Sequence, residues 1–175
     1  MEPIEIFAQA LSIVGMVINI LSMQCKRTSG VITMLLVGST FFGVSYLLLG
    51  SFAGAIMNIF SVFRSLLLLF DKRTRANSQL VLLLTVLLAC SAVGLYLDGP
   101  IALLPMLGQL GSTMGMWQRN SAKLRLWQLF GSSPFWLINN ILVFSIGGIL
   151  CEVFVITSVL ISIARYGWKN LKESD

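Results

Sequence analysis

The sequence contains no histidine, and charged residues make up only 11% of it. Without histidine the chain lacks the usual proton carrier near neutral pH and the commonest metal ligand. Its three cysteines, Cys25, Cys90 and Cys151, have no CxxC spacing, so they predict neither a disulfide framework nor a zinc site. The sequence also has no P-loop and no nucleophile–base triad. We therefore expect no catalytic residue, no metal, no cofactor and no enzymatic activity.

Apolar residues, in contrast, fill 57% of the 175 positions, and the mean hydropathy is +0.89. A soluble domain of this size could not remove so much apolar surface from water, because small domains leave a large share of their surface exposed. We therefore expect an integral membrane protein whose first partner is membrane lipid. This expectation excludes a nucleic-acid partner, despite the formal net charge of +5.

The hydrophobic segments have the length of transmembrane helices, since a bilayer core of about 30 Å takes roughly 20 residues at a rise of about 1.5 Å each. This length predicts an all-α membrane protein with seven spans: 4–23, 31–49, 52–70, 79–97, 101–117, 124–145 and 147–165. The first span lacks the basic start and the cleavage site of a signal peptide, so we expect it to be retained.

Lysine and arginine residues gather after the first, third, fifth and seventh spans. They are Lys26, Arg27, Lys72, Arg73, Arg75, Arg119, Lys123, Arg125, Arg165, Lys169 and Lys172. Because cytoplasmic loops are rich in these residues, the pattern predicts the N-terminus outside and the C-terminus in the cytoplasm. This topological role explains them more simply than specific lipid recognition does.

An offset of 94 residues aligns the last three spans with the first three without a gap. Under it, Ser145 falls on Ser51 and Gly148 on Gly54. Three spans reverse the chain, so a fourth must return it if both triplets are to point the same way. We expect a 3+1+3 plan: a first triple-helix bundle (1–70), a basic loop and linker helix (71–98), a second triple-helix bundle (99–168) and a cytoplasmic tail (169–175).

Five expected helices carry a stripe of small or polar residues at helical spacing. The stripes contain Ala8, Ser12, Gly15, Asn19 and Ser22; Ser39, Gly43, Tyr46 and Gly50; Gly54, Asn58, Ser61 and Ser65; Pro105, Gly108, Ser112 and Gly115; and Ser132, Ser133, Trp136 and Asn140. Close helix packing in lipid explains any one stripe. Five stripes in two repeats favour a shared polar interior. The linker helix, almost purely apolar over 80–88, is expected to face lipid.

Two ionisable residues lie inside the expected spans, where a charge costs about 2.5–3.5 kcal/mol at the helix centre. Glu152 aligns with Asn58 under the repeat, so the two side chains could bind a polar solute from both sides. The alternative is that Glu152 reaches the outer interface or caps a helix. For Arg64, extension of the side chain to the cytoplasmic surface is favoured over a substrate role. An ion pair with Glu152 is not expected, because the two depths differ by about 10 Å.

Further polar candidates for solute contact are Asn19, Tyr46, Gln109, Asn139 and Asn140. A buried asparagine, however, more often forms an interhelical hydrogen bond. Trp136 would supply an apolar wall. Pro105 and Pro134 should bend the fifth and sixth spans, since proline removes a backbone donor and crowds the preceding turn, and they are the candidate hinges.

Four motifs carry a family resemblance: 43–50 (GVSYLLLG), 103–108 (LLPMLG), 136–140 (WLINN) and 145–148 (SIGG). Together with Glu152 they resemble the YgjV family of bacterial inner-membrane proteins, over essentially the whole chain. The resemblance implies a multi-pass protein of the bacterial inner (plasma) membrane.

The 3+1+3 plan also resembles the SWEET/PQ-loop (MtN3-like) group of sugar and amino-acid transporters. That resemblance implies a central pocket between two bundles that rock about prolines, with Asn58 and Glu152 in the place of an asparagine pair. The glutamate argues against a strictly neutral sugar. We expect a transporter of a small solute, sugar-like or small organic, that works by alternating access. The alternative is a non-transporting receptor or assembly protein, because the KDEL receptor resembles the same plan. Whether the chain forms a homo-oligomer is left undecided.

Overall fold

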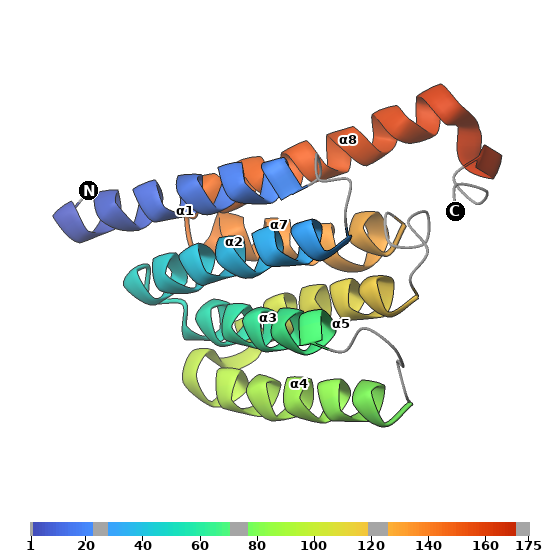
Figure 1. Cartoon of the computed structure of the whole chain (residues 1–175). Helices are drawn as coiled ribbons and strands as arrows, with labels where there is room; N and C mark the ends of the chain where they lie inside the picture. The colour runs from blue at the N-terminus through green and yellow to red at the C-terminus, as the bar shows by residue number, and fades with distance from the viewer. Residues whose placement is uncertain (1, 23–27, 71–76, 119–125, 171–175) are drawn as a thin grey trace.

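The computed structural model describes residues 2–22, 28–70, 77–118 and 126–170, and these residues are almost entirely helical (Figure 1). The helices are α1 (Pro3–Ser22), α2 (Thr28–Leu48), α3 (Phe52–Phe70), α4 (Asn77–Asp98), α5 (Leu103–Trp117), α7 (Ser133–Leu142) and α8 (Ile146–Asn170). A 3₁₀ turn, η1 (Gly99–Ala102), precedes α5, and a π-helical segment, η2 (Trp127–Ser132), precedes α7. The all-α expectation is confirmed.

Three helical stretches among the described residues are long and apolar enough to cross a membrane: Pro3–Ser22, Phe52–Phe70 and Ser78–Trp117. Ile32–Leu48 and Ile146–Ile161 are shorter apolar helices. The stretch of 40 residues from Ser78 is about twice the length of one span. It divides at Gly99, where a φ of 67° lets the chain reverse between α4 and α5 (Figure 1). Glycine adopts this conformation readily because it has no Cβ.

The helices close into a ring around a polar centre. In the ring α1 packs on α2, α2 on α3, α3 on α5, α5 on η2 and α7, α7 on α8, and α8 again on α1. Helix α4 packs outside the ring, against α3 and α5, and lies at the edge of the bundle in Figure 1. Only a narrow row of α4 is buried, including Leu83 and Leu87, whereas Val81 and Leu88 are exposed. This exposure is what a lipid-facing helix requires.

The α2–α3 and α7–α8 connections have the same backbone hydrogen bonds at positions 94 residues apart. The amides of Ser51 and Ser145 each donate to the carbonyl five residues earlier, at 2.9 Å in both turns. The residue before each serine has a positive φ, 75° at Gly50 and 52° at Phe144. The offset that aligns the two halves of the sequence therefore also aligns these two turns.

Each turn is also held by a side chain of another helix, through equivalent backbone groups. The amide of Ala53 donates to Asp98 Oδ2 at 2.6 Å, and the amide of Gly147 donates to Ser12 Oγ at 3.1 Å. The first amides of a helix have no partner within the helix, and in lipid they need one inside the protein. These bonds therefore attach α4 to the start of α3, and α1 to the start of α8.

Gln9 strengthens the attachment of α1 to the α7–α8 turn. Its Nε2 donates to the Phe144 carbonyl at 2.5 Å, and its Oε1 accepts from the Ile146 amide at 2.9 Å. Nearby, Gly147 lies so close to α1 that an added Cβ would overlap backbone atoms of Ser12. Helices α1 and α8 thus meet backbone to backbone at this point.

The two prolines begin helices. Pro134 is the second residue of α7 and follows the π-helical segment η2, and the bend expected at this proline stays a prediction. Pro105 is the third residue of α5 and follows η1. In a first turn the missing proline N–H leaves no intrahelical bond unmade. The expectation that Pro105 bends the fifth span is therefore wrong, and its role as a hinge, like that of Pro134, stays a prediction.

The orientation depends on residues outside the described ranges. These are Lys26, Arg27, Lys72, Arg73, Arg75, Arg119, Lys123, Arg125 and Lys172. The linker loop 71–76 and the end of the tail, 171–175, also lie outside them. The seven-span count, the 3+1+3 grouping, the domain boundaries and the orientation therefore stay predictions.

We predict that Gly147→Ala lowers the free energy of unfolding by about 1–3 kcal/mol, because the new methyl group must displace α1 backbone. The measurement is the thermal unfolding midpoint of the purified protein in detergent. The matched control is Gly43→Ala, where the nearest atom to an added Cβ is Asn58 Cβ at 3.4 Å, an ordinary contact. Equal midpoints for the two variants would contradict the close approach of α1 and α8.

Candidate functional site

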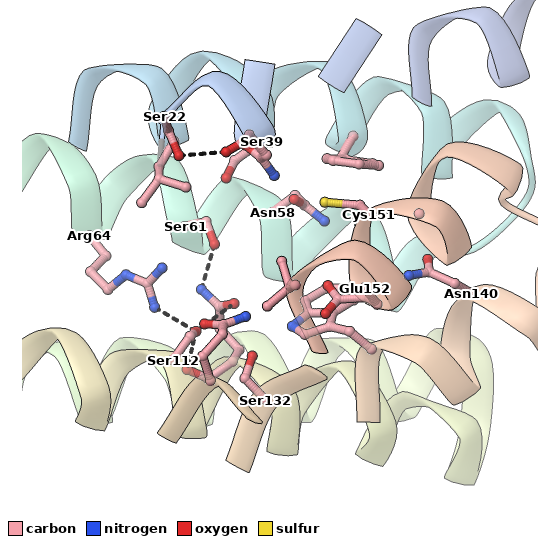
Figure 2. Close-up of a pocket in the computed structure, with 18 of the residues that line it drawn as sticks. Ser22, Ser39, Asn58, Ser61, Arg64, Ser112, Ser132, Asn140, Cys151 and Glu152 are labelled. Atoms are coloured by element: carbon pink, nitrogen blue, oxygen red, sulfur yellow. Dashed lines mark hydrogen bonds between the residues drawn. The ribbon is translucent and has the colours of Figure 1, made fainter. Parts of the chain in front are cut away.

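The ring encloses a cavity of about 230 Å³ that every helix of the ring helps to line (Figure 2). Of the described residues of α4, none lines it. The lining residues are Asn19, Ser22, Leu35, Ser39, Phe42, Tyr46, Asn58, Ser61, Arg64, Gln109, Ser112, Met116, Gln128, Ser132, Trp136, Asn140, Gly148, Cys151, Glu152 and Val155. Since a water molecule takes about 30 Å³ of liquid, the cavity has room for several waters or one small solute.

Seven of the eight residues named as candidates for solute contact line this one cavity. They are Asn19 of α1, Tyr46 of α2, Asn58 of α3, Gln109 of α5, Trp136 and Asn140 of α7, and Glu152 of α8. The stripes drawn at helical spacing therefore do meet in a shared polar interior. That these residues bind a solute stays a prediction.

Tyr46 joins the two repeats at the centre of the ring. Its hydroxyl donates to Asn140 Oδ1, and the two residues are 94 positions apart. The Tyr46 ring also stacks between Phe42 and Trp136, with centroid distances of 6.2 and 6.0 Å. Phe42 and Trp136 are likewise partners under the repeat. Gly108 of α5 makes room for this stack, because an added Cβ would overlap the Trp136 indole.

Arg64 points into the bundle, and the expectation that it extends to the cytoplasmic surface is wrong. Its side chain is only 5% exposed. Its Nη1 donates to Ser112 Oγ at 3.0 Å and to Thr113 Oγ1 at 2.8 Å, and Figure 2 shows it turned toward Ser112. The physical reason is that α5 presents two hydroxyl acceptors at the depth of Arg64, which hold the guanidinium inside the ring.

Glu152 faces the cavity and does not reach the outer interface. Its Oε2 is buried and has no hydrogen-bond partner, while Ser133 at the start of α7 interacts with the carboxyl group. Asn58 lies on the facing helix α3, where its Nδ2 donates to the Gly54 carbonyl at 2.9 Å. Within the described part of the chain no ion pair joins Glu152 to Arg64, as expected.

Gln109 connects the Arg64 side of the cavity to α3. Its side-chain Nε2 donates to Ser61 Oγ at 2.5 Å. Its backbone carbonyl accepts hydrogen bonds from the hydroxyls of Ser112 and Thr113 at 3.1 and 2.7 Å. The same two hydroxyls thus accept from Arg64 and donate to α5. This arrangement orients their lone pairs toward the guanidinium.

Among the lining residues that the sequence analysis did not single out are Gln128 and Cys151. Gln128 lies four residues before Ser132 on the stripe of the sixth span, so extending that stripe backwards would have found it. Cys151 belongs to a further stripe, formed by Gly148, Cys151, Glu152 and Val155 at helical spacing. Asn139, in contrast, does not line the cavity; it is 1% exposed in the packing of α7.

The cavity combines hydroxyl, amide, aromatic and charged groups, which can bind a polar solute. Among the described residues, no group of three or more histidine, cysteine, aspartate or glutamate side chains could hold a metal ion. The lining extends to Ser22 near the end of α1. Toward the α2–α3 and α7–α8 turns the lining includes Tyr46, Asn140 and Gly148.

We predict that Tyr46→Phe lowers the free energy of unfolding by about 1 kcal/mol, because Asn140 then loses its partner. A double-mutant cycle with Asn140→Leu, measured by thermal unfolding in detergent, should give a coupling of about 0.6 kcal/mol. Additive effects of the two substitutions would show that the bond does not join the repeats.

A family model, Imp-YgjV, described as bacterial inner membrane protein, matches residues 6–170. The match includes nearly all of the described helices. Searches of curated proteins and of solved structures found no match. The resemblance to the SWEET/PQ-loop group gains no support from these comparisons.

Proposed function

The chain belongs to the Imp-YgjV family of bacterial inner membrane proteins, and we propose that it transports a small solute by alternating access. The observation that carries this proposal is the central cavity. It brings residues of both repeats around one space, and it contains hydrogen-bonding groups that a purely structural interior would pair among themselves. A site between two repeats near the middle of the bundle is typical of transporters.

The proposal includes seven spans in a 3+1+3 plan, with the N-terminus outside. Support comes from the matching turns after α2 and α7, and from the position of α4 outside the ring. If α4 only reverses the direction of the chain between the two triplets, it is not required to line the cavity. The α4–η1–α5 stretch of 40 residues supplies two of the spans.

In this orientation the cavity faces the cytoplasm. Gln9 and the Tyr46–Asn140 bond lie on the outer side of the cavity, where they close the contact between the repeats. Alternating access requires the two triplets to part on this side and to close on the other. The bonds of Gln9 to Phe144 and Ile146 are then the contacts that break when the outer side opens.

We predict that Asn58→Ala and Glu152→Gln abolish transport while the protein stays folded, because both side chains face the solute. The first measurement is thermal stabilisation by sugars, amino acids and organic acids; a ligand at 100 times its Kd should add about 2.7 kcal/mol. Uptake of the stabilising solute into proteoliposomes follows. The control is Thr85→Val on the exposed face of α4. A receptor or assembly protein would bind a partner without solute flux, and this outcome would replace the proposal.

For the topology, we predict that a fluorescent protein fused after Asp175 folds and fluoresces, because the C-terminus lies in the cytoplasm. A periplasm-active phosphatase fused there should be inactive. Pro100→Cys, in a background without Cys25, Cys90 and Cys151, should react with a membrane-impermeant maleimide from outside. Labelling of this position only after the membrane is broken would reverse the orientation.

A further inference from the structure

Arg64 and Glu152 place one basic and one acidic group on the wall of the same cavity. They are the two charged residues among the side chains that line this cavity. Arg64 comes from α3 and Glu152 from α8, and Figure 2 shows both in the space between these helices. A charge in the interior of a membrane protein needs a partner, and neither residue supplies one for the other.

Among the described residues, none of the groups that contact the guanidinium of Arg64 is acidic. Its hydrogen-bond partners Ser112 and Thr113 are neutral hydroxyls, its Cζ lies 6.0 Å from the centroid of the Phe60 ring, and its Nε is buried without a hydrogen-bond partner. Ser65 Oγ, one residue further along α3, is also buried and unpartnered. Arginine binds carboxylate groups through parallel N–H donors, so a carboxylate is the group that this end of the cavity lacks.

Glu152, in contrast, lacks a positively charged hydrogen-bond donor. Its Oε2 is buried without a donor, although the carboxyl faces a polar space. Asn58, its partner under the repeat, uses one N–H of its amide nitrogen within α3, where it donates to the Gly54 carbonyl. What remains without a partner on this side of the cavity is the carboxylate oxygen of Glu152. An ammonium group, with three donors and a positive charge, would satisfy it.

The Arg64 side and the Glu152 side of the cavity are separated along the bundle axis. Arg64 lies six residues beyond Asn58 on α3, which corresponds to about 9 Å of helical rise, and both charged side chains are long enough to shorten this gap. A neutral sugar would leave both charges without a counter-ion. A simple anion would pair Arg64 alone, and a simple cation would pair Glu152 alone.

We propose that the solute is a small zwitterion, an amino-carboxylate whose carboxylate binds at Arg64 and whose ammonium group binds at Glu152. This inference rests on the proposed transport function for its physiological meaning. The binding site itself rests on the two unpartnered groups. The cavity of about 230 Å³ limits the solute to a few carbon atoms between or beside the charges.

The test uses three zwitterions with increasing charge separation: glycine, β-alanine and 4-aminobutyrate. Each is compared with its acid without the amine (acetate, propionate, butyrate) and with its amine without the acid. Glucose is the neutral probe. Binding to the purified full chain in detergent is read from the thermal unfolding midpoint over a concentration series, and transport from counterflow in proteoliposomes.

The variants are crossed against these probes. We expect at least one zwitterion to bind about tenfold or more tightly than its own acid or amine, since each charged hydrogen bond contributes about one order of magnitude or more. Arg64→Gln should remove that advantage over the amine, and Glu152→Gln the advantage over the acid. Arg64→Lys keeps the positive charge, so it should retain part of the binding, and it provides the test if Arg64→Gln fails to fold. Thr85→Val should behave like the unmodified chain.

The inference is overturned if no zwitterion stabilises the protein, if acids bind as well as zwitterions while Glu152→Gln has no effect, or if only glucose binds. Its failure differs from failure of the proposed function. Zwitterion binding with the crossed pattern but without counterflow would refute transport and keep the site. Counterflow of another solute that is unaffected by Arg64→Gln would keep transport and refute the site.

Discussion

Polar groups cannot remain unpaired toward lipid, and this constraint explains why the polar side chains of the described helices gather inside the bundle. The helices have one apolar face and one small or polar face, so they close into a ring that turns the polar faces inward. Within the ring the groups pair across helices, as Tyr46 does with Asn140 and Gln109 with Ser61. The groups that find no partner include the Nε of Arg64 and the Oε2 of Glu152, and both of these residues line the cavity.

The same constraint explains the close backbone contacts between the helices. Lipid supplies little hydrophobic force to press helices together, so van der Waals contact and interhelical hydrogen bonds must hold them. The clearest cases are Gly147 of α8 against α1 and Gly111 of α5 against η2, because an added Cβ at either position would overlap backbone atoms of the neighbouring element. Small residues such as these allow close helix packing, whereas larger polar residues line the cavity.

Much of the fold could be predicted because hydrophobic length and helical spacing are local properties. Seven of the eight solute candidates share one cavity for that reason. The direction of Arg64 could not be predicted, since it depends on Ser112 and Thr113, 48 and 49 residues away, and depth alone does not reveal what faces a side chain. The π-helical turns of η2 were also hidden, because a shift of register by one residue leaves the composition of the segment unchanged.

The two repeats agree at their turns and differ along the cavity. Turn residues 94 apart share hydrogen bonds and positive φ angles. In the cavity, however, Asn58 stands opposite Glu152, and the position equivalent to Arg64 is Ser158. A symmetric scaffold with a symmetric lining would present the same groups to both halves of a solute. Because Arg64 and Glu152 give the cavity one basic and one acidic side, a solute whose two ends differ in charge is the one that we propose for it.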